Sequence, residues 1–316
     1  MDRIDAMKAL LAAVDEGSLS AASRKLGMPL ATMSRKVSEL EAHLRAQVLI
    51  RTSRKLILTE VGQAYVTACR RILDEIDEAE RAAASEYRVP RGHLTLAASV
   101  MFGQVHVEPV VLDFLEAYPE ITVRLILSDT VANILDDHID AAIRVGTLPD
   151  SSMVAQRLGE TGWITCASPA YLARHGTPQT PADLAGHRCI LFEGHSSTLW
   201  SSETWRFGSA KAPLAVPIQP RLRVNTASAA LAAAIAGTGI VRVLRYQAVR
   251  ALDAGQLQIV LPDFEPDPIP VHLLHTGGPI LPLKLRAFLD FAAPRLRASL
   301  KGQAGSATFR PARTPS

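Results

Sequence analysis

A segment near the N-terminus, GMPLATMSRKVSELE (residues 27–41), carries side chains that can donate hydrogen bonds to an anion. One face of the segment is apolar at steps of three and four, the spacing of a helix that packs on a core. These apolar residues are Leu30, Met33, Val37, Leu40 and, just beyond, Leu44. The other face holds short hydroxyls beside bases, namely Thr32, Ser34, Arg35, Lys36 and Ser38. Such groups suit phosphates and the base edges of a DNA major groove.

The preceding residues predict two shorter helices that would position this face. Residues 4–14 have helical apolar spacing, Gly17 ends the connection, and Ser18 or Ser20 can cap a second helix that stops at Gly27. Pro29 is tolerated in the first turn of the next helix. Short helices joined by a tight glycine-containing turn, the later one bearing hydroxyls and bases, are typical of a helix-turn-helix.

A basic turn follows that helix. Residues 48–50 and 56–59 are short β-rich runs, and Arg51, Arg54 and Lys55 lie in the turn between them. This arrangement predicts a wing whose tip lies along phosphates. A basic helix face alone is usually just solvated, and a basic turn alone is usually only a turn. Both features, in this order within about sixty residues, favour nucleic-acid binding.

Composition and charge narrow the remaining possibilities. The chain has 316 residues, with 48% hydrophobic and 21% charged residues, so two or more globular domains are expected. The net charge of +3 is mild, but residues 24–55 contain eight Lys or Arg residues against two carboxylates, and residues 60–88 are net acidic. A basic block beside an acidic segment is typical of a small anion-binding unit attached to another domain.

Secretion, a membrane span and a metal centre are not indicated by the sequence. The N-terminus MDRIDAMKAL has early acids and no long apolar run, and Gly237, Gly239 and Arg242 interrupt the most apolar stretch. The three cysteines are widely spaced, without a disulfide or metal-ligand pattern. We therefore expect a cytoplasmic protein with reduced thiols, without a membrane partner, cofactor or metal.

Residues 14–65, VDEGSLSAASRKLGMPLATMSRKVSELEAHLRAQVLIRTSRKLILTEVGQAY, are similar to the winged helix-turn-helix of the LysR-type transcriptional regulators. The matching positions are Gly17-Ser18, Ala21-Ala22, Leu26, Met33-Ser34-Arg35, Leu40-Glu41, Arg51, Leu58-Thr59 and Gly62. The resemblance continues along most of the chain and implies a DNA-binding domain over residues 1–60. Together with the charge pattern it selects these DNA-binding residues: Ser18, Pro29, Leu30, Thr32, Ser34, Arg35, Lys36, Arg51, Arg54 and Lys55.

Two departures from the family pattern affect this helix. The family usually has Leu-Gly after it, but Leu44 is followed by Arg45 here, which replaces a helix stop with a helix former. Leu30 stands where many members carry a polar residue or proline. Its side chain can touch a thymine methyl or pack inward, and the sequence favours neither.

Residues 61–89 predict a long amphipathic helix followed by a hinge at residues 89–92. Its apolar stripe has no domain around it, so we expect it to pack on a second copy of the chain, as the linker helix of the family does. Packing on the chain's own C-terminal domain is the alternative. The predicted dimerisation residues are Tyr65, Ile72, Ile76 and Ala79.

Strands and helices alternate over residues 93–300, which predicts an α/β effector domain with mostly parallel sheets in two lobes. The predicted first lobe comprises residues 93–161 and 269–300, the second residues 162–268, and residues 301–316 form a disordered tail. A helix is expected around residues 131–137. The family resemblance implies a fold like that of periplasmic solute-binding proteins.

Ligands of such sheets bind beyond the carboxyl ends of strands, near helix N-termini. This rule and the resemblance select the following effector-binding residues: Ser99, Val100, Phe102, Arg144, Asn225 and Thr226. Ser99 and Thr226 can instead serve only as helix caps, and Arg144 can pair with an acid. Arg242 stands where relatives tend to have an apolar residue. It is interpreted either as an exposed base at a strand end or as a charge that faces the cleft.

No nucleophile-elbow, Walker, HExxH or paired CxxC motif is present, so an enzyme is not expected. The favoured function is a LysR-type regulator that binds double-stranded DNA and a small-molecule effector, with an anion as one candidate. We expect a homodimer or homotetramer that works with RNA polymerase. One alternative is a redox-responsive regulator that uses Cys166 and Cys189. Another is a small-molecule-binding protein whose N-terminal block only mediates assembly.

Overall fold

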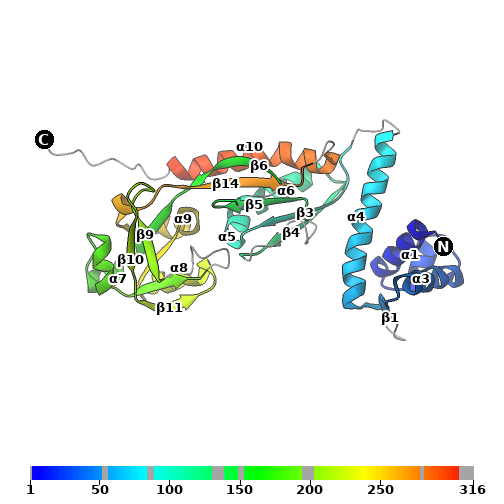
Figure 1. Cartoon of the computed structure of the whole chain (residues 1–316), viewed down its shortest axis with the longest axis horizontal. Helices are drawn as coiled ribbons and strands as arrows, with labels where there is room; N and C mark the ends of the chain where they lie inside the picture. The colour runs from blue at the N-terminus through cyan, green and yellow to red at the C-terminus, as the bar shows by residue number, and fades with distance from the viewer. Residues whose placement is uncertain are drawn as a thin grey trace. The chain divides into compact units, whose positions relative to one another are not determined.

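The computed structural model describes residues 2–51, 56–83, 89–129, 139–148, 153–193, 203–277 and 281–305 (Figure 1). The chain divides into two compact units, Met1–Val89 and Pro90–Ser316. The predicted wing tip, at residues 52–55, and the predicted helix at residues 131–137 lie outside the described residues.

The N-terminal unit is a winged helix-turn-helix that continues into a long helix. Its elements are α1 (Arg3–Asp15), α2 (Leu19–Lys25), α3 (Leu30–Leu44), β1 (Leu49–Arg51), β2 (Leu56–Leu58) and α4 (Glu60–Ala83). Alanines on α1 let the helices approach closely, since Ala6, Ala9 and Ala13 are fully buried. One core cluster joins α1, α3, the wing and α4 through Leu10, Val37, Leu40, Val48 and Val66.

Several residues of the family motif hold the wing to α3. The Glu41 carboxylate accepts hydrogen bonds from the backbone N–H groups of Val48 (3.0 Å) and Leu49 (3.1 Å). The Thr59 hydroxyl donates to the Gln47 carbonyl at 2.7 Å and accepts from the N–H of Gly62 at 2.9 Å. A Cβ on Gly62 would overlap the Val48 carbonyl oxygen, so a larger residue there would displace the wing.

Helix α3 ends at Leu44, which contradicts the expectation that Arg45 extends it. Arg45 takes the left-handed conformation (φ 52°), and its N–H and that of Ala46 satisfy the last carbonyls of the helix. Of the two placements that the sequence left open for Leu30, inward packing does not occur, because the residue lies in the first turn and is 47% exposed. Met33, Val37 and Leu40 are buried as predicted. Pro29 is the N-cap residue and not the first helical one.

The C-terminal unit holds two five-stranded sheets, each with helices on it. The first contains β3 (Gly92–Ala98), β4 (Ile121–Leu127), β5 (Ala141–Val145), β6 (Val154–Thr161) and β14 (Ile269–His275) in the order β4-β3-β5-β14-β6. The second contains β7 (Trp163–Ala167), β8 (Cys189–Phe192), β11 (Pro220–Val224), β12 (Ile240–Leu244) and β13 (Gln258–Val260) in the order β11-β8-β12-β7-β13. The chain passes from the first sheet to the second at Gly162 and returns ahead of Ile269.

Both sheets are mixed, whereas mostly parallel sheets were expected. In the first sheet β14 is antiparallel to β5 and β6, and in the second β7 is antiparallel to β12 and β13. The strands next to the crossings between lobes do not return through a helical crossover, which parallel pairing requires. The parallel pairs are those of β3 with β4 and β5 and those of β8 with β11 and β12.

Helices and a hairpin cover the sheets (Figure 1). In the first lobe α5 (Val100–Phe102), the π-helical turn η1 (Gly103–Val107), α6 (Glu108–Ala117) and α10 (Leu283–Gly305) enclose the largest core cluster. In the second lobe α8 (Ala227–Ile235) and α9 (Arg245–Asp253) lie on one face. The other face carries α7 (Pro169–His175), η2 (Pro181–Gly186), η3 (Pro262–Phe264) and the hairpin of β9 (Thr204–Phe207) and β10 (Leu214–Pro217).

Helix α10 continues to Gly305, so the first five residues of the predicted tail, 301–305, are helical. Lys301, Gln303 and Ala304 are good helix formers, and a single Gly302 is tolerated. Residues 306–316 lie outside the described residues. Within the described part of the chain, no helix is long and apolar enough to cross a membrane.

Candidate nucleic-acid interface and effector site

The exposed face of α3 contains the residues predicted to meet DNA. Leu30 is 47% exposed and the Arg35 side chain 66% exposed, while Thr32 and Ser34 are half-buried. Pro29 is exposed at the start of the same helix. Ser18 has a structural role as well, because its hydroxyl caps α2 by accepting a hydrogen bond from the N–H of Ala21 at 3.1 Å.

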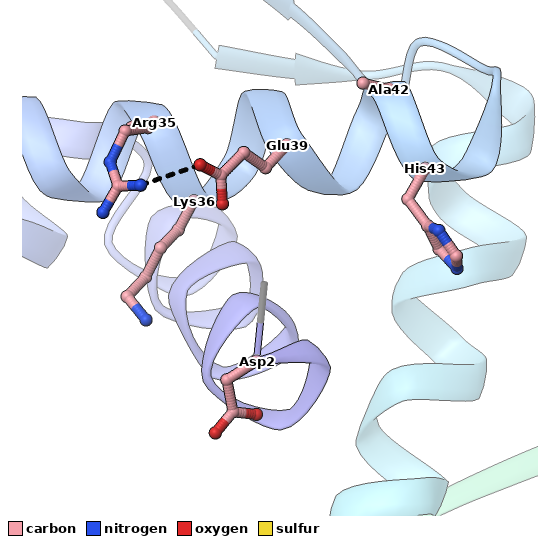
Figure 2. Close-up of a pocket in the computed structure, with 6 residues that line it drawn as sticks. All are labelled: Asp2, Arg35, Lys36, Glu39, Ala42 and His43. Carbon is pink, nitrogen blue, oxygen red and sulfur yellow. Dashed lines mark hydrogen bonds and ion pairs between the residues drawn. The ribbon is translucent and has the colours of Figure 1, made fainter.

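Both bases of this face are held by carboxylates. Arg35 pairs with Glu39 one turn further along α3 at 2.8 Å, and Lys36 pairs with Asp5 of α1 at 2.9 Å. Both bases line an open groove of about 620 Å³ between α3 and the start of α1. Figure 2 shows Arg35 joined to Glu39 there. The Lys36 ammonium lowers the pKa of the Asp5 carboxyl, mainly through their hydrogen bond.

The wing is described only at its base. Arg51 ends β1, which pairs antiparallel with β2 in the register Arg51↔Leu56. Arg54 and Lys55 lie outside the described residues, as does the side chain of Arg51.

Helix α4 packs one of its sides on its own winged domain. Val66, Cys69 and Leu73 are at most 8% exposed, and Arg70 pairs with Asp15 of α1. Tyr65 contacts the same core, and burial raises the pKa of its hydroxyl to about 12.

The other predicted dimerisation residues lie further along α4. Ile72 and Ile76 are half-buried, and the side chain of Ala79 is outside the described set. The apolar stripe predicted for a partner is therefore partly used within the chain.

At the predicted effector site, a carboxylate of the chain itself occupies the start of α5. The N–H of Val100 donates to Asp129 Oδ1 at 3.0 Å. Ser99 is the N-cap residue of α5 but makes no side-chain cap bond. Its buried hydroxyl lies close to the Tyr246 phenol, and no described atom meets hydrogen-bond geometry with it. Burial strongly raises the pKa of Tyr246.

Phe102 is a core residue and not a surface open to ligand. It is fully buried, with its ring 5.2 Å from that of Tyr246 on α9 and 4.6 Å from that of His106. His106 also contacts the Ser299 hydroxyl of α10 at 2.8 Å. Through these rings the start of the α5–α6 helical segment contacts the second lobe.

The remaining predicted effector residues lie at strand ends in both lobes. Arg144 is near the end of β5, opposite His272 of β14, and burial lowers the pKa of its guanidinium. Thr226 caps α8 by accepting from the N–H of Ala229 at 3.3 Å, and Asn225 beside it is exposed. Met101 of α5 packs against the core cluster that contains Ala227, the first residue of α8.

Arg242 fits neither of its two interpretations. It is 9% exposed and neither faces open solvent as a strand-end base nor presents an unpaired charge, because it pairs with Glu265 at 2.9 Å.

The redox alternative is contradicted by the sheet order. Cys166 is on β7 and Cys189 on β8, with β12 hydrogen-bonded between them. Two strand spacings separate the cysteines by about 10 Å, which exceeds the Cα separation that a disulfide allows. They also belong to different core clusters. Burial raises the pKa of each thiol to about 12, which makes both unreactive.

Three acidic residues at these sites were missed by the sequence reasoning. Asp129 follows β4, so the rule that selected Ser99 after β3 would also have found it. Glu39 is four residues after Arg35, the spacing of an ion pair on a helix. Asp5 carries no such local signal, because its partner Lys36 is on another helix. Within the described residues, no three His, Cys, Asp or Glu side chains form a metal-binding group.

Two family models match the chain. Residues 4–63 match the bacterial regulatory helix-turn-helix protein, lysR family, and residues 88–297 match the LysR substrate binding domain. A helix-turn-helix joined to a two-lobed ligand-binding domain defines a ligand-controlled DNA-binding regulator. The chain belongs to the LysR family of transcriptional regulators.

Relatives support the same assignment over nearly the whole length. An HTH-type transcriptional repressor of Pseudomonas aeruginosa is 34% identical over 92% of this chain and 91% of its own. The HTH-type transcriptional activator AaeR of Escherichia coli is 31% identical over 92% of this chain and 93% of its own. The structure of CrgA, a LysR-type regulator from Neisseria meningitidis, has a TM-score of 0.59 at 31% identity and covers 92% of this chain and 98% of that chain.

The predicted family, fold class and function are thereby confirmed. Members of this family bind DNA through the helix-turn-helix and small-molecule effectors through the second domain, and they are regulators and not enzymes. The interpretation of the N-terminal block as a mere assembly module is overturned by the helix-turn-helix match.

Proposed function

We propose that α3 reads operator DNA through its exposed face, with Arg35 as the principal contact. The observation that carries this proposal is the exposure of the Arg35 side chain, 66%, on a helix whose opposite face is fully buried. Arginine can donate two parallel hydrogen bonds to guanine O6 and N7. Thr32, Ser34, Lys36 and Leu30 complete the face, and Arg51, Arg54 and Lys55 contact phosphates from the wing.

The test is Arg35→Ala, measured on an operator selected from random-sequence DNA with the purified protein. The variant should bind the operator more weakly by about 1–3 kcal/mol and keep its melting temperature. Arg157→Ala is the matched control, because Arg157 is 63% exposed and pairs with Glu160 at 2.8 Å in the other unit. Wild-type affinity of Arg35→Ala would remove this residue from the interface.

The effector site is proposed at the start of α5, with Ser99 and Val100, and at the start of α8, with Asn225 and Thr226. Arg144 offers a cation near the end of β5. An anionic effector would have to displace Asp129 from the Val100 N–H, so its binding should strengthen in Asp129→Asn. A thermal-shift screen of small organic acids tests this, with Ser99→Ala and Thr226→Ala expected to reduce the shift.

We further propose that α4 pairs with a second copy, giving a homodimer or a homotetramer. Two winged domains on one dimer would bind two half-sites, which multiplies their affinity through effective concentration. A regulator of this kind acts on chromosomal DNA together with RNA polymerase, which implies a cytoplasmic location.

A further inference from the structure

The DNA-facing groove of the free protein carries paired charges, although it belongs to a DNA-binding helix. Arg35 and Lys36 are the two bases at its edge, and each has a carboxylate within 2.9 Å, Glu39 and Asp5 respectively. Figure 2 shows that Arg35, Lys36 and Glu39 all line the same groove. The positive charge that should attract phosphates is therefore compensated at this place within the chain.

We propose that Glu39 and Asp5 are specificity-determining residues that hold Arg35 and Lys36 in the free protein. They thereby weaken binding to non-cognate DNA more than binding to the operator. This inference rests on the proposed role of Arg35 and Lys36 in reading DNA.

The two pairs differ in how firmly they hold their base. The Arg35 and Glu39 side chains are 66% and 38% exposed, so water screens their attraction and the pair opens easily. Lys36 is only 17% exposed, while Asp5 is 53% exposed, so the ammonium lies against the protein and has less freedom to reorient. Arg35 is thus the base that leaves its carboxylate more readily and contacts DNA first.

The discrimination follows from what each kind of DNA offers in exchange. Non-specific binding depends on the number of phosphates that bases neutralise. A base that keeps its carboxylate adds nothing to that number, and the carboxylate itself repels phosphates. A cognate guanine offers Arg35 two well-aligned acceptors, which replace Glu39 fully. On the operator, the hydrogen bonds to guanine therefore offset the free energy needed to open the Arg35–Glu39 pair. On random-sequence DNA nothing offsets it.

The experiment compares Glu39→Gln and Asp5→Asn with the parent on operator DNA and on random-sequence DNA over a range of salt. Each variant should bind random DNA roughly two- to fivefold more tightly, the scale of an exposed ion pair. The slope of log affinity against log salt should steepen by about 0.9 for each base released. Operator affinity should rise less, so the ratio of specific to non-specific affinity falls.

Glu160→Gln is the matched control, since it removes the same charge from an exposed pair at the same distance, 2.8 Å, in the other unit. It should leave both affinities unchanged. Melting temperatures verify that each variant is folded.

The proposal is overturned if Glu39→Gln leaves the random-DNA affinity and the salt slope as in the parent. It is also overturned if operator affinity falls and a single C·G pair loses its preference, because Glu39 would then read cytosine directly. The double variant Arg35→Ala/Glu39→Gln separates this inference from the proposed function. The gain from Glu39→Gln should vanish when Arg35 is absent, and a gain that persists would mean general repulsion only. If Arg35→Ala alone has no effect on operator binding, the proposed function fails first.

Discussion

Arg242 and Glu265 form an ion pair with an Nη2–Oε2 distance of 2.9 Å whose side chains are only 7% and 10% exposed. The Thr165 hydroxyl donates to the other carboxylate oxygen at 2.6 Å. The guanidinium lies 5.0 Å from the ring centroid of Trp163 and 4.7 Å from that of Phe207. Burial lowers the pKa of Arg242, and Glu265 opposes that change. The ion pair joins β12 to the segment that returns to the first lobe, and the contact with Trp163 joins β12 to the start of β7.

Removal of one partner of this pair should strongly destabilise the second lobe. Arg242→Ala would leave the Glu265 carboxylate buried without its cation, at a cost of about 3–5 kcal/mol in the free energy of unfolding. Urea unfolding followed by tryptophan fluorescence measures the loss. Arg223→Ala is the control, because Arg223 is 42% exposed in its pairs with Glu193 and Glu203, and it should cost at most about 1 kcal/mol. Equal losses for both variants would contradict the buried character of the first pair.

Arg45→Gly should stabilise the winged domain. Arg45 has φ 52°, a conformation that costs a residue with a Cβ roughly 1 kcal/mol and costs glycine almost nothing. The melting temperature of the N-terminal domain should rise accordingly. Arg45→Ala keeps the Cβ and serves as the control, with no comparable gain expected. A gain in the alanine variant would point to the charge of Arg45 and not to its backbone.

Ile72→Glu/Ile76→Glu should dissociate the proposed dimer while the winged domain stays folded. Both isoleucines are half-buried within the chain, so a carboxylate at either place is tolerated in the monomer but strongly disfavoured in an apolar seam. Analytical ultracentrifugation and an operator-binding titration measure the two effects. Leu73→Glu is the comparison, because Leu73 is 8% exposed and its replacement should unfold the domain instead. A double variant that remains dimeric would move the seam elsewhere.

DNA binding should not respond to thiol oxidation. Cys166 and Cys189 are fully buried on strands that are not neighbours, and their thiols have pKa values raised to about 12. Operator affinity should be the same in excess reductant and after mild peroxide treatment, and in Cys166→Ser/Cys189→Ser. A shift in affinity that the double serine variant abolishes would restore the redox alternative.

Sequence patterning predicted those elements whose residues carry local signals. The period of apolar residues located α3 and its buried Met33, Val37 and Leu40. For the start of α2 the sequence allowed two caps, Ser18 and Ser20, and the structure has Ser18. The predicted end of α3 was wrong, because the chain must turn into the wing at Arg45 despite the helix propensity of arginine. Glu41 fixes this turn through its hydrogen bonds to the N–H groups of Val48 and Leu49.

Non-local pairing was the part that sequence could not supply. Strand β14 returns to the first sheet more than a hundred residues after β6 and pairs antiparallel with β5 and β6. No local sequence pattern encodes this pairing. The burial of Arg242 likewise depends on Glu265 and on rings from two other strands. Lys36 of α3 pairs with Asp5 of α1, a residue 31 positions away in the sequence.

Helix α4 is attached to its winged domain, so the two move as one rigid body. The burial of Val66, Cys69 and Leu73 and the Arg70–Asp15 pair hold the helix to the domain. The 24 residues of α4 span about 36 Å. A tilt of about 10° at one end would displace the other by roughly 6 Å, nearly two base-pair steps of 3.4 Å along a DNA strand. In the proposed dimer, a small change in the crossing angle of the two α4 helices would thus produce a large change in the distance between the two recognition helices.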